Sequence, residues 1–189
     1  MKARSLIAAL ITGASLAAFA APEKFEFDAT HTYPHFEINH LGFSVMRGMF
    51  TDTTGTLTLD RAAKTGQVEA TISTKSINTG MDKRDEHLRS KDFFNVEQFP
   101  TMTFKSEKFA FKKGEPVAAE GTLTLLGETK PVKLMIKPSK CAVRMVDQKF
   151  VCGADVSTTI KRSDWGLKAY VPYVGDDVKI SIEVEAVKL

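Results

Sequence analysis

The C-terminal segment of this chain alternates strictly between apolar and polar residues. Every second position from residue 178 to residue 186 is Val, Ile or Ala, whereas the positions between them are Lys, Ser or Glu. Successive side chains of a β-strand point to opposite faces, so a period of two predicts a strand with one buried face. Shorter alternating segments surround residues 36–38, 57–59, 68–72 and 132–136. Roughly nine or ten such strands can be distinguished.

Two further patterns refine this prediction. Between residues 101 and 111 the apolar positions change parity, from Met102 and Phe104 to Phe109 and Phe111, which indicates a β-bulge or a bend. Turn residues stand at 112–114 and 127–128. Helical features are confined to residues 79–90, where we expect one short helix with Thr79 as its N-cap and Asp82 closing a capping box.

Many short strands with one apolar face form either a sandwich or a closed barrel. The single Trp165 follows both cysteines, so the Cys–Trp–Cys order of immunoglobulin domains is absent. Closure into a barrel also removes exposed sheet edges. We therefore predict an all-β fold, an antiparallel barrel with one short helix.

The N-terminus has the features of an export signal. Lys2 and Arg4 precede an apolar stretch that ends at Phe19, and Ala18 and Ala20 supply the small residues that a signal peptidase requires. The stretch is shorter than the about 20 residues that span a bilayer as a helix. We expect a signal peptide at residues 1–20, cleavage after Ala20, and one exported domain at residues 21–189.

The composition of the mature chain excludes two classes of protein. The net charge of +3 includes Lys2 and Arg4, so the mature chain carries +1, and no run of Lys or Arg lies on one face. Nucleic-acid binding requires a basic patch that neutralises phosphates, so a nucleic-acid partner is not expected. No later segment is apolar enough to cross a membrane as a helix, so we do not expect an integral membrane protein.

The two cysteines, Cys141 and Cys152, flank a segment with the pattern of a hairpin around residues 146–148. Exported proteins meet an oxidising compartment, where such a pair forms a disulfide. The C-x-x-C spacing that lowers a thiol pKa is absent. We predict a structural disulfide that joins the two strands of this hairpin.

Several sequence blocks together resemble the YceI-like family of polyisoprenoid-binding periplasmic proteins. The blocks are His40-Leu41-Gly42, Gly48-Met49-Phe50 leading to Gly55, Arg84 to Phe94 (RDEHLRSKDFF), Phe99-Pro100, Gly121 to Gly127 followed by Thr129 to Val132, and Arg162 to Gly166 (RSDWG). Their order and spacing cover nearly the whole mature chain. The cysteine pair does not belong to this pattern.

The resemblance implies an extended, lipocalin-like antiparallel barrel in the periplasm with a hydrophobic channel. Its cargo would be a polyisoprenoid or similar long-chain lipid, such as an isoprenoid quinone, a polyprenyl phosphate or a fatty-acid derivative. The resemblance also implies binding rather than catalysis, no catalytic cofactor, and a homodimer as one form of self-association.

Large, flexible apolar side chains suit a channel that packs against a lipid chain. The residues that we expect to line it are Phe36, Ile38, Phe43, Met46, Phe50, Phe93, Phe94, Phe99, Met102, Phe104 and Trp165. Each of them would equally suit an ordinary filled core. For the lipid head group we expect His40, Arg84 or Arg162 near the barrel mouth. Arg84 and its neighbours could instead form ion pairs on a solvated helix, and Arg162 could pair with Asp164 to close a barrel end.

No catalytic or metal centre is expected. Ser44 lacks the second glycine of a nucleophile elbow, and Asp85, Glu86 and His87 are helical neighbours that point in different directions. Pro34 lies between His31 and His35 and disfavours the helical pair of histidines that would hold a metal, although the two could share one face of a strand.

The alternative to a lipid carrier is a periplasmic interaction or stress-response module with a filled core and no cargo. Such a module would act on a partner protein, for example a membrane redox partner. A channel lined by Phe36, Phe50 and Phe104 would favour the carrier, whereas a solid interior would favour the module.

Overall fold

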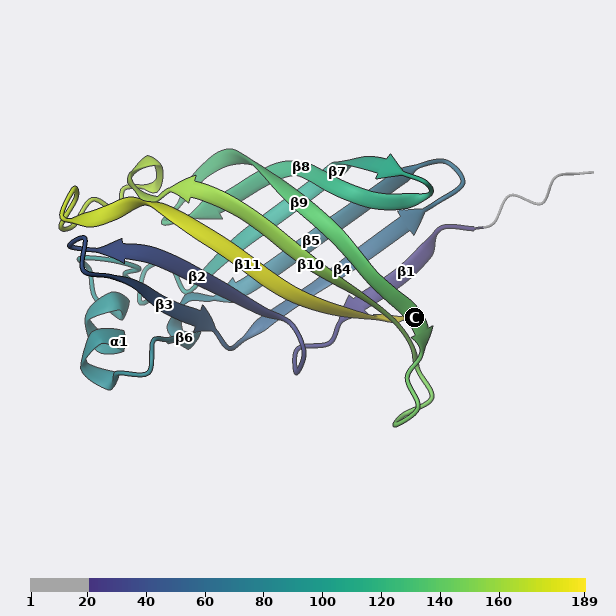
Figure 1. Ribbon diagram of the computed structural model, residues 1–189, viewed down its shortest axis with the longest axis horizontal. Helices are drawn as coiled ribbons and strands as arrows, with labels where there is room; N and C mark the ends of the chain where they lie inside the picture. The colour runs from purple at the N-terminus through teal and green to yellow at the C-terminus, as the bar shows by residue number, and fades with distance from the viewer. Residues whose placement is uncertain (1–20) are drawn as a thin grey trace, which may run out of the picture.

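The computed structural model describes residues 21–189, so the expected signal peptide lies outside the described residues. The chain forms one antiparallel sheet of eleven strands (Figure 1). The strands are β1 (Glu23–Phe27), β2 (Tyr33–His40), β3 (Ser44–Phe50), β4 (Thr53–Asp60), β5 (Thr65–Ser73), β6 (Ile77–Asn78), β7 (Thr101–Lys112), β8 (Glu115–Leu125), β9 (Glu128–Val143), β10 (Phe150–Lys161) and β11 (Val174–Lys188).

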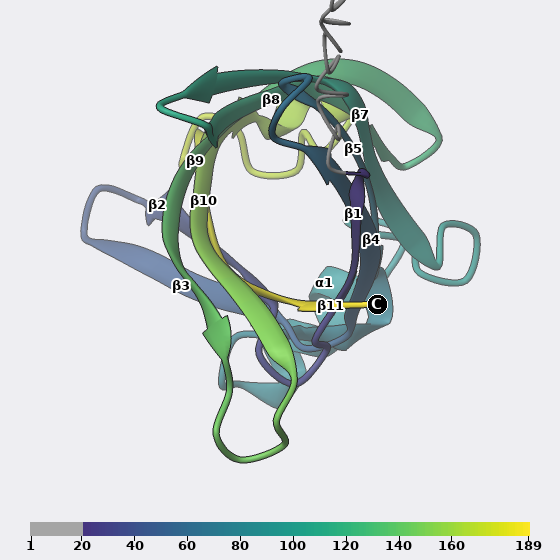
Figure 2. The same ribbon diagram turned by 90° about the vertical axis from the view of Figure 1, so that its right-hand side faces the viewer.

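The sheet closes into an eight-stranded barrel because β11 pairs with β1. Around the ring the order is β1, β4, β5, β7, β8, β9, β10 and β11, and Figure 2 shows this ring from one end. The prediction of an antiparallel barrel with one α-helix is confirmed.

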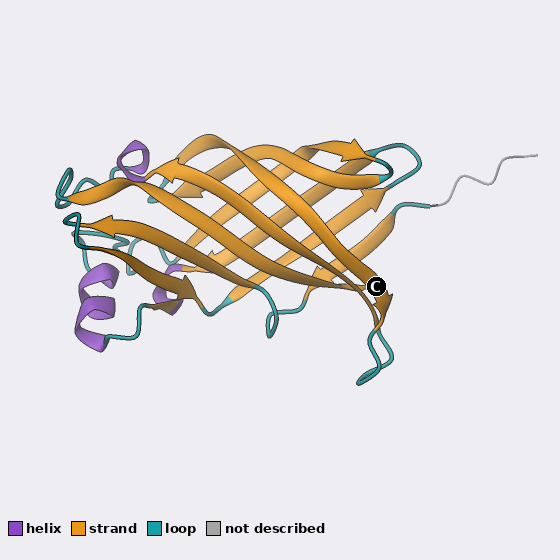
Figure 3. Cartoon of the chain, viewed as in Figure 1, coloured by secondary structure: helices purple, strands orange, loops and turns teal. Residues whose placement is uncertain are grey.

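One edge of β11 is shared between two strands. Its last residues pair with β1, with Ala186 opposite Phe27, whereas its earlier part pairs with β2, with Ser181 opposite His35. The β2–β3 hairpin therefore continues the wall at one end of the barrel, and β6 pairs with the end of β3. Three short helical segments follow strands at this end of the barrel (Figure 3). They are the helix α1 (Asp82–Arg89) and the 3₁₀ turns η1 (Thr74–Ser76) and η2 (Arg162–Trp165).

The opposite end of the barrel is filled by side chains. Phe25, Leu59, Val151 and Ala186 are all buried there, with Phe25 only 1% exposed. These residues come from strands that lie beside the C-terminus and the β9–β10 hairpin (Figure 1). This end of the interior is an ordinary packed core.

The disulfide and the irregular features predicted from sequence are present. Cys141 and Cys152 are bonded and lie directly opposite each other on β9 and β10. The register of β7 against β8 shifts between Lys105 and Lys108, where Ser106 Oγ accepts the Lys108 amide at 3.1 Å. This bulge explains the parity change of the apolar residues in β7.

The capping box expected from Thr79 and Asp82 does not form. Met81 is the N-cap residue, and no side chain caps the helix. Thr79 instead donates its backbone amide to Asp85 Oδ1 at 2.9 Å, and its hydroxyl donates to the same oxygen. Asp85 is 4% exposed, so its carboxylate requires partners from the protein, and Thr79 supplies them.

Candidate functional site

The interior of the barrel holds a cavity of about 480 Å³ on the side of α1 and the β2–β3 hairpin. The barrel wall contributes aliphatic, Met and Phe side chains from six strands: Ile72, Met102, Phe104, Leu123, Leu125, Val132, Leu134, Ile160, Val178, Ile180 and Ile182. Alternation along each strand places these side chains inside and their polar neighbours outside. The result is a cavity with an almost wholly apolar lining.

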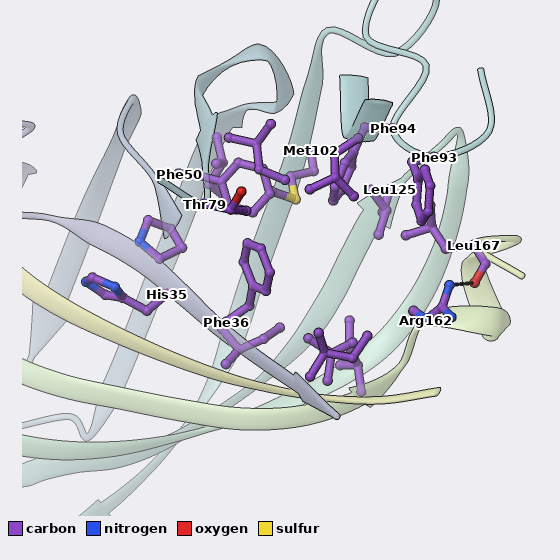
Figure 4. A pocket seen from close by; sticks show the side chains of 18 of the residues that line it. His35, Phe36, Phe50, Thr79, Phe93, Phe94, Met102, Leu125, Arg162 and Leu167 are labelled. Carbon is purple, nitrogen blue, oxygen red and sulfur yellow. Dashed lines mark hydrogen bonds between the residues drawn. The ribbon is translucent and has the colours of Figure 1, made fainter. Parts of the chain in front are cut away.

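Aromatic rings close the side of the cavity that faces the hairpin and the helix. Phe36 and Phe50 have ring centroids 6.0 Å apart, and Phe94 meets Phe50 edge to face at 5.5 Å (Figure 4). Phe36 lies directly over Gly48 on the neighbouring strand, where any Cβ would overlap the ring. The glycine in the Gly48-Met49-Phe50 block therefore allows Phe36 to lie flat along the cavity wall.

Most of the expected lining residues border this cavity: Phe36, Ile38, Met46, Phe50, Phe93, Phe94, Met102 and Phe104. Phe43, Phe99 and Trp165 lie elsewhere. Phe43 is 90% exposed in the β2–β3 turn, Phe99 packs against Gly127, and Trp165 is buried with its Nε1 donating to the Leu123 carbonyl oxygen at 3.1 Å.

The expected lining residues included none from β11, which also borders the cavity. Val178, Ile180 and Ile182 all border the cavity. Their alternation was the clearest pattern in the sequence, but it indicated only an inward face. The signal that would have found them is the combination of that inward face with pairing to β2, which brings Phe36 opposite Ile180.

Arg162 borders the cavity and is 4% exposed. Its guanidinium donates to the carbonyl oxygens of Gly175, Leu167, Ala169 and Val174 at 2.7 to 3.1 Å. The alternative pair between Arg162 and Asp164 does not form, because among the described residues the guanidinium bonds only to these carbonyls. Burial lowers the pKa of Arg162, with Asp176 acting in the opposite direction. Arg162 thus ties the loop after η2 to the start of β11.

Arg84 also borders the cavity, and it too binds backbone. It donates to Thr79 Oγ1 and to the Thr79 carbonyl, both at 2.7 Å. Arg89 donates to the carbonyls of Lys75 and Ile77. The expected ion pairs of these arginines on a solvated helix are therefore replaced by bonds that hold α1 against residues 75–79. His40 lines the cavity at the end of β2.

A second polar cluster lies at the disulfide end. Asp28, His31 and Glu185 bring their side-chain oxygen and nitrogen atoms within 4.8 Å of one another. Arg144 Nη1 lies 2.8 Å from Asp28 Oδ2 and 3.0 Å from Glu185 Oε2. The guanidinium therefore occupies the position between the carboxylates that a cation would take. The cluster is an ion-pair network that joins the β9–β10 hairpin to β11 and to the loop after β1.

We predict that Arg162→Met lowers the free energy of unfolding by about 2–5 kcal/mol, because it leaves several buried carbonyls without donors. Arg47→Met is the matched control, since Arg47 is 68% exposed in an ion pair with Glu37 and should cost less than about 1 kcal/mol. Urea denaturation measures both. Equal losses in the two variants would contradict the role assigned to Arg162.

We also predict a loss of stability in acid that depends on Asp28. The Thr30 hydroxyl, followed by Arg144, lowers the pKa of Asp28, and Arg144 lowers the pKa of Asp147 to about 2. A carboxyl with a lowered folded-state pKa stabilises the fold above its unfolded pKa of about 4, and this stabilisation is lost as the pH falls through the folded value. The free energy of unfolding should fall from about pH 4 downward, and it should fall less steeply in Asp28→Asn. An identical slope in that variant would contradict the prediction.

Comparison with known proteins gives a consistent result. A family model of the YceI-like domain matches residues 25–186. A UPF0312 protein of Pseudomonas aeruginosa is 34% identical over 193 residues, which cover 98% of each chain. Residues 21–189 contain no helix with the length and apolar character that a membrane crossing requires.

Solved structures share the barrel. The Campylobacter jejuni YCEI protein is 33% identical with a TM-score of 0.71, over 80% of this chain and 90% of that chain. A polyisoprenoid binding domain from Saccharophagus degradans, implicated in plant cell wall breakdown, has a TM-score of 0.68 at 16% identity, over 87% of this chain and 98% of that chain. At that identity the likeness shows the fold alone. The family match across nearly the whole described chain, together with relatives about one third identical, shows that this chain belongs to the YceI-like family.

Proposed function

We propose that this chain is a periplasmic carrier that holds the hydrocarbon tail of a polyisoprenoid or similar long-chain lipid inside its barrel. The observation that carries the proposal is the 480 Å³ cavity with its apolar lining. An interior of this kind favours a hydrophobic guest, because apolar surface on both sides is removed from water. The alternative, an interaction module with a solid core, does not account for a hollow half beside a packed half.

The size of the cavity suggests how much of a lipid it holds. A cavity of about 150 Å³ in another protein holds one benzene ring, so 480 Å³ corresponds by simple scaling to about 20 carbon atoms. That is three or four isoprene units. A longer polyisoprenoid would leave part of its chain outside. Each buried CH₂ contributes about 0.8 kcal/mol before the entropic cost of ordering the chain.

The head group would lie near the polar residues that border the cavity. Arg84 uses Nε and Nη2 to hold Thr79, which leaves Nη1 for an anionic group. His40 and His87 also border the cavity. An anionic or carbonyl head group, such as that of a polyprenyl phosphate or a quinone, suits these donors.

The family and the compartment support the same proposal. The Saccharophagus degradans domain with this fold is described as polyisoprenoid binding, and family membership favours binding over catalysis. The Cys141–Cys152 disulfide suits an oxidising compartment such as the periplasm. The signal-like sequence at residues 1–20, with cleavage after Ala20, suits the same location.

The direct test is mass spectrometry of an organic extract from protein purified without detergent from the periplasm. We expect one long-chain lipid in near-stoichiometric amount. Val178→Phe should reduce this amount severalfold, because the larger side chain takes up cavity volume. Val146→Phe is the matched control, since Val146 is 95% exposed at the tip of the β9–β10 hairpin. Extracts without enriched lipid, together with no binding of added isoprenoids, would leave the module as the better explanation.

Chain length provides a second prediction. Affinity for prenyl alcohols should rise from C10 to about C20 and then level off, because carbons beyond the cavity remain in water. Displacement of a fluorescent fatty acid measures this series. A continued rise well beyond C20 at constant increments would show that the cavity expands to take longer chains and that its 480 Å³ volume does not set the limit.

A further inference from the structure

Two loops at the cavity end of the barrel expose apolar and aromatic side chains. In the β2–β3 turn Phe43 is 90% exposed, beside Leu41 and Val45. In the loop between η2 and β11 Tyr173 is 72% exposed and Tyr170 is 58% exposed. We call residues 41–45 and 170–173 the apolar tip. Large apolar side chains exposed together mark a surface that contacts something other than water.

The two parts of the apolar tip are joined to each other. The Leu41 amide donates to the Tyr173 carbonyl oxygen at 3.0 Å, and His40 pairs with Val174 in the sheet. Arg162 holds the neighbouring carbonyls of Ala169 and Val174. Figure 1 shows the β2–β3 turn beside the start of β11 at the same end of the barrel. The exposed rings are therefore presented by a fixed backbone.

The apolar tip is continuous with the cavity. Tyr170 borders the cavity while remaining 58% exposed, so the cavity reaches the surface beside it. Its ring stacks on Phe93 at 6.2 Å and meets His87 edge to face at 6.2 Å. A hydrocarbon chain that entered here would pass directly from the tip to the apolar lining. The other end of the barrel offers no such route, because Phe25, Leu59 and Ala186 fill it.

The scarcity of charged side chains at the apolar tip favours a lipid bilayer over a protein as the binding partner of this surface. From residue 165 to residue 174 the only charged side chain is Lys168, and residues 41–46 carry no charge. The tip itself carries aliphatic side chains, Phe43 and two tyrosines without a carboxylate, and Lys168 lies beside it in the same loop. A tyrosine side chain combines an apolar ring with a polar hydroxyl, which suits the head-group layer of a bilayer. A lysine nearby favours anionic lipid.

We propose that the apolar tip docks this protein on the surface of a lipid bilayer, with Phe43 and Tyr173 inserted into the head-group region, so that the cavity opens toward the membrane. This inference rests on the proposed carrier function, since a bilayer is where a carried lipid would be taken up or released. Docking gives the lipid a path that avoids open water.

The first experiment places a tryptophan at the tip. The chain's single Trp165 is 3% exposed and supplies a constant background, so Phe43→Trp reports the environment of the turn. Vesicles of phosphatidylethanolamine with phosphatidylglycerol should shift its emission to the blue. Val146→Trp, at an exposed apolar position of the opposite end, should show no shift. No shift at position 43, or an equal shift at position 146, would overturn the proposal.

The second experiment separates docking from carriage. The double variant Phe43→Ser with Tyr173→Ser should lower co-sedimentation with the same vesicles by about tenfold for each ring lost. Its binding of cis-parinaric acid, a fluorescent long-chain fatty acid, should equal that of the parent, because neither residue borders the cavity. Vesicle binding that does not change in this variant would overturn docking. Failure of the parent to bind the fatty acid would instead count against the carrier function.

Discussion

The hydrogen-bonded edge of β11 organises the rest of the molecule. This strand runs from Val174 to Lys188, and its outer edge pairs first with β2 and then, beyond Glu183, with β1. Because two strands share the edge, β1 closes the end that is packed around Phe25, and the β2–β3 hairpin forms the wall at the other end. The packed half and the hollow half of the interior both follow from this division.

Arg84, Arg89 and Arg162 leave the cavity lining apolar because most of their hydrogen bonds go to backbone carbonyl oxygens. Arg162 bonds four carbonyls of residues 167–175, and Arg84 and Arg89 hold residues 75–79. These bonds fix the loops around the cavity without placing a carboxylate inside it. Motifs that looked like binding residues in the sequence therefore first serve to position the loops that surround the site.

Local patterns predicted the fold well. The parity change in β7 is the bulge at Ser106, and the spacing of Cys141 and Cys152 matches directly opposed positions on a hairpin. Predictions that depended on distant contacts were less successful. Thr79 was expected to cap α1, but the buried carboxylate of Asp85 recruits it instead. Phe43 was expected inside the barrel, yet it lies outside, because it belongs to the turn and not to the alternating part of β2 or β3.

By itself the sequence determined the strands with clear alternation, the face of each that points inward, and the pairing of the cysteines, because these properties depend on neighbours along the chain or across one hairpin. Tertiary structure alone decided which inward residues meet packed side chains and which border the cavity. Phe25 and Phe36 both lie in short alternating strands and both point inward, yet one is a core residue and the other lines the cavity. A period of two specifies the face of a strand and carries no information about its position along the barrel axis. For β1 and β2 that position is set by their pairing with different parts of β11.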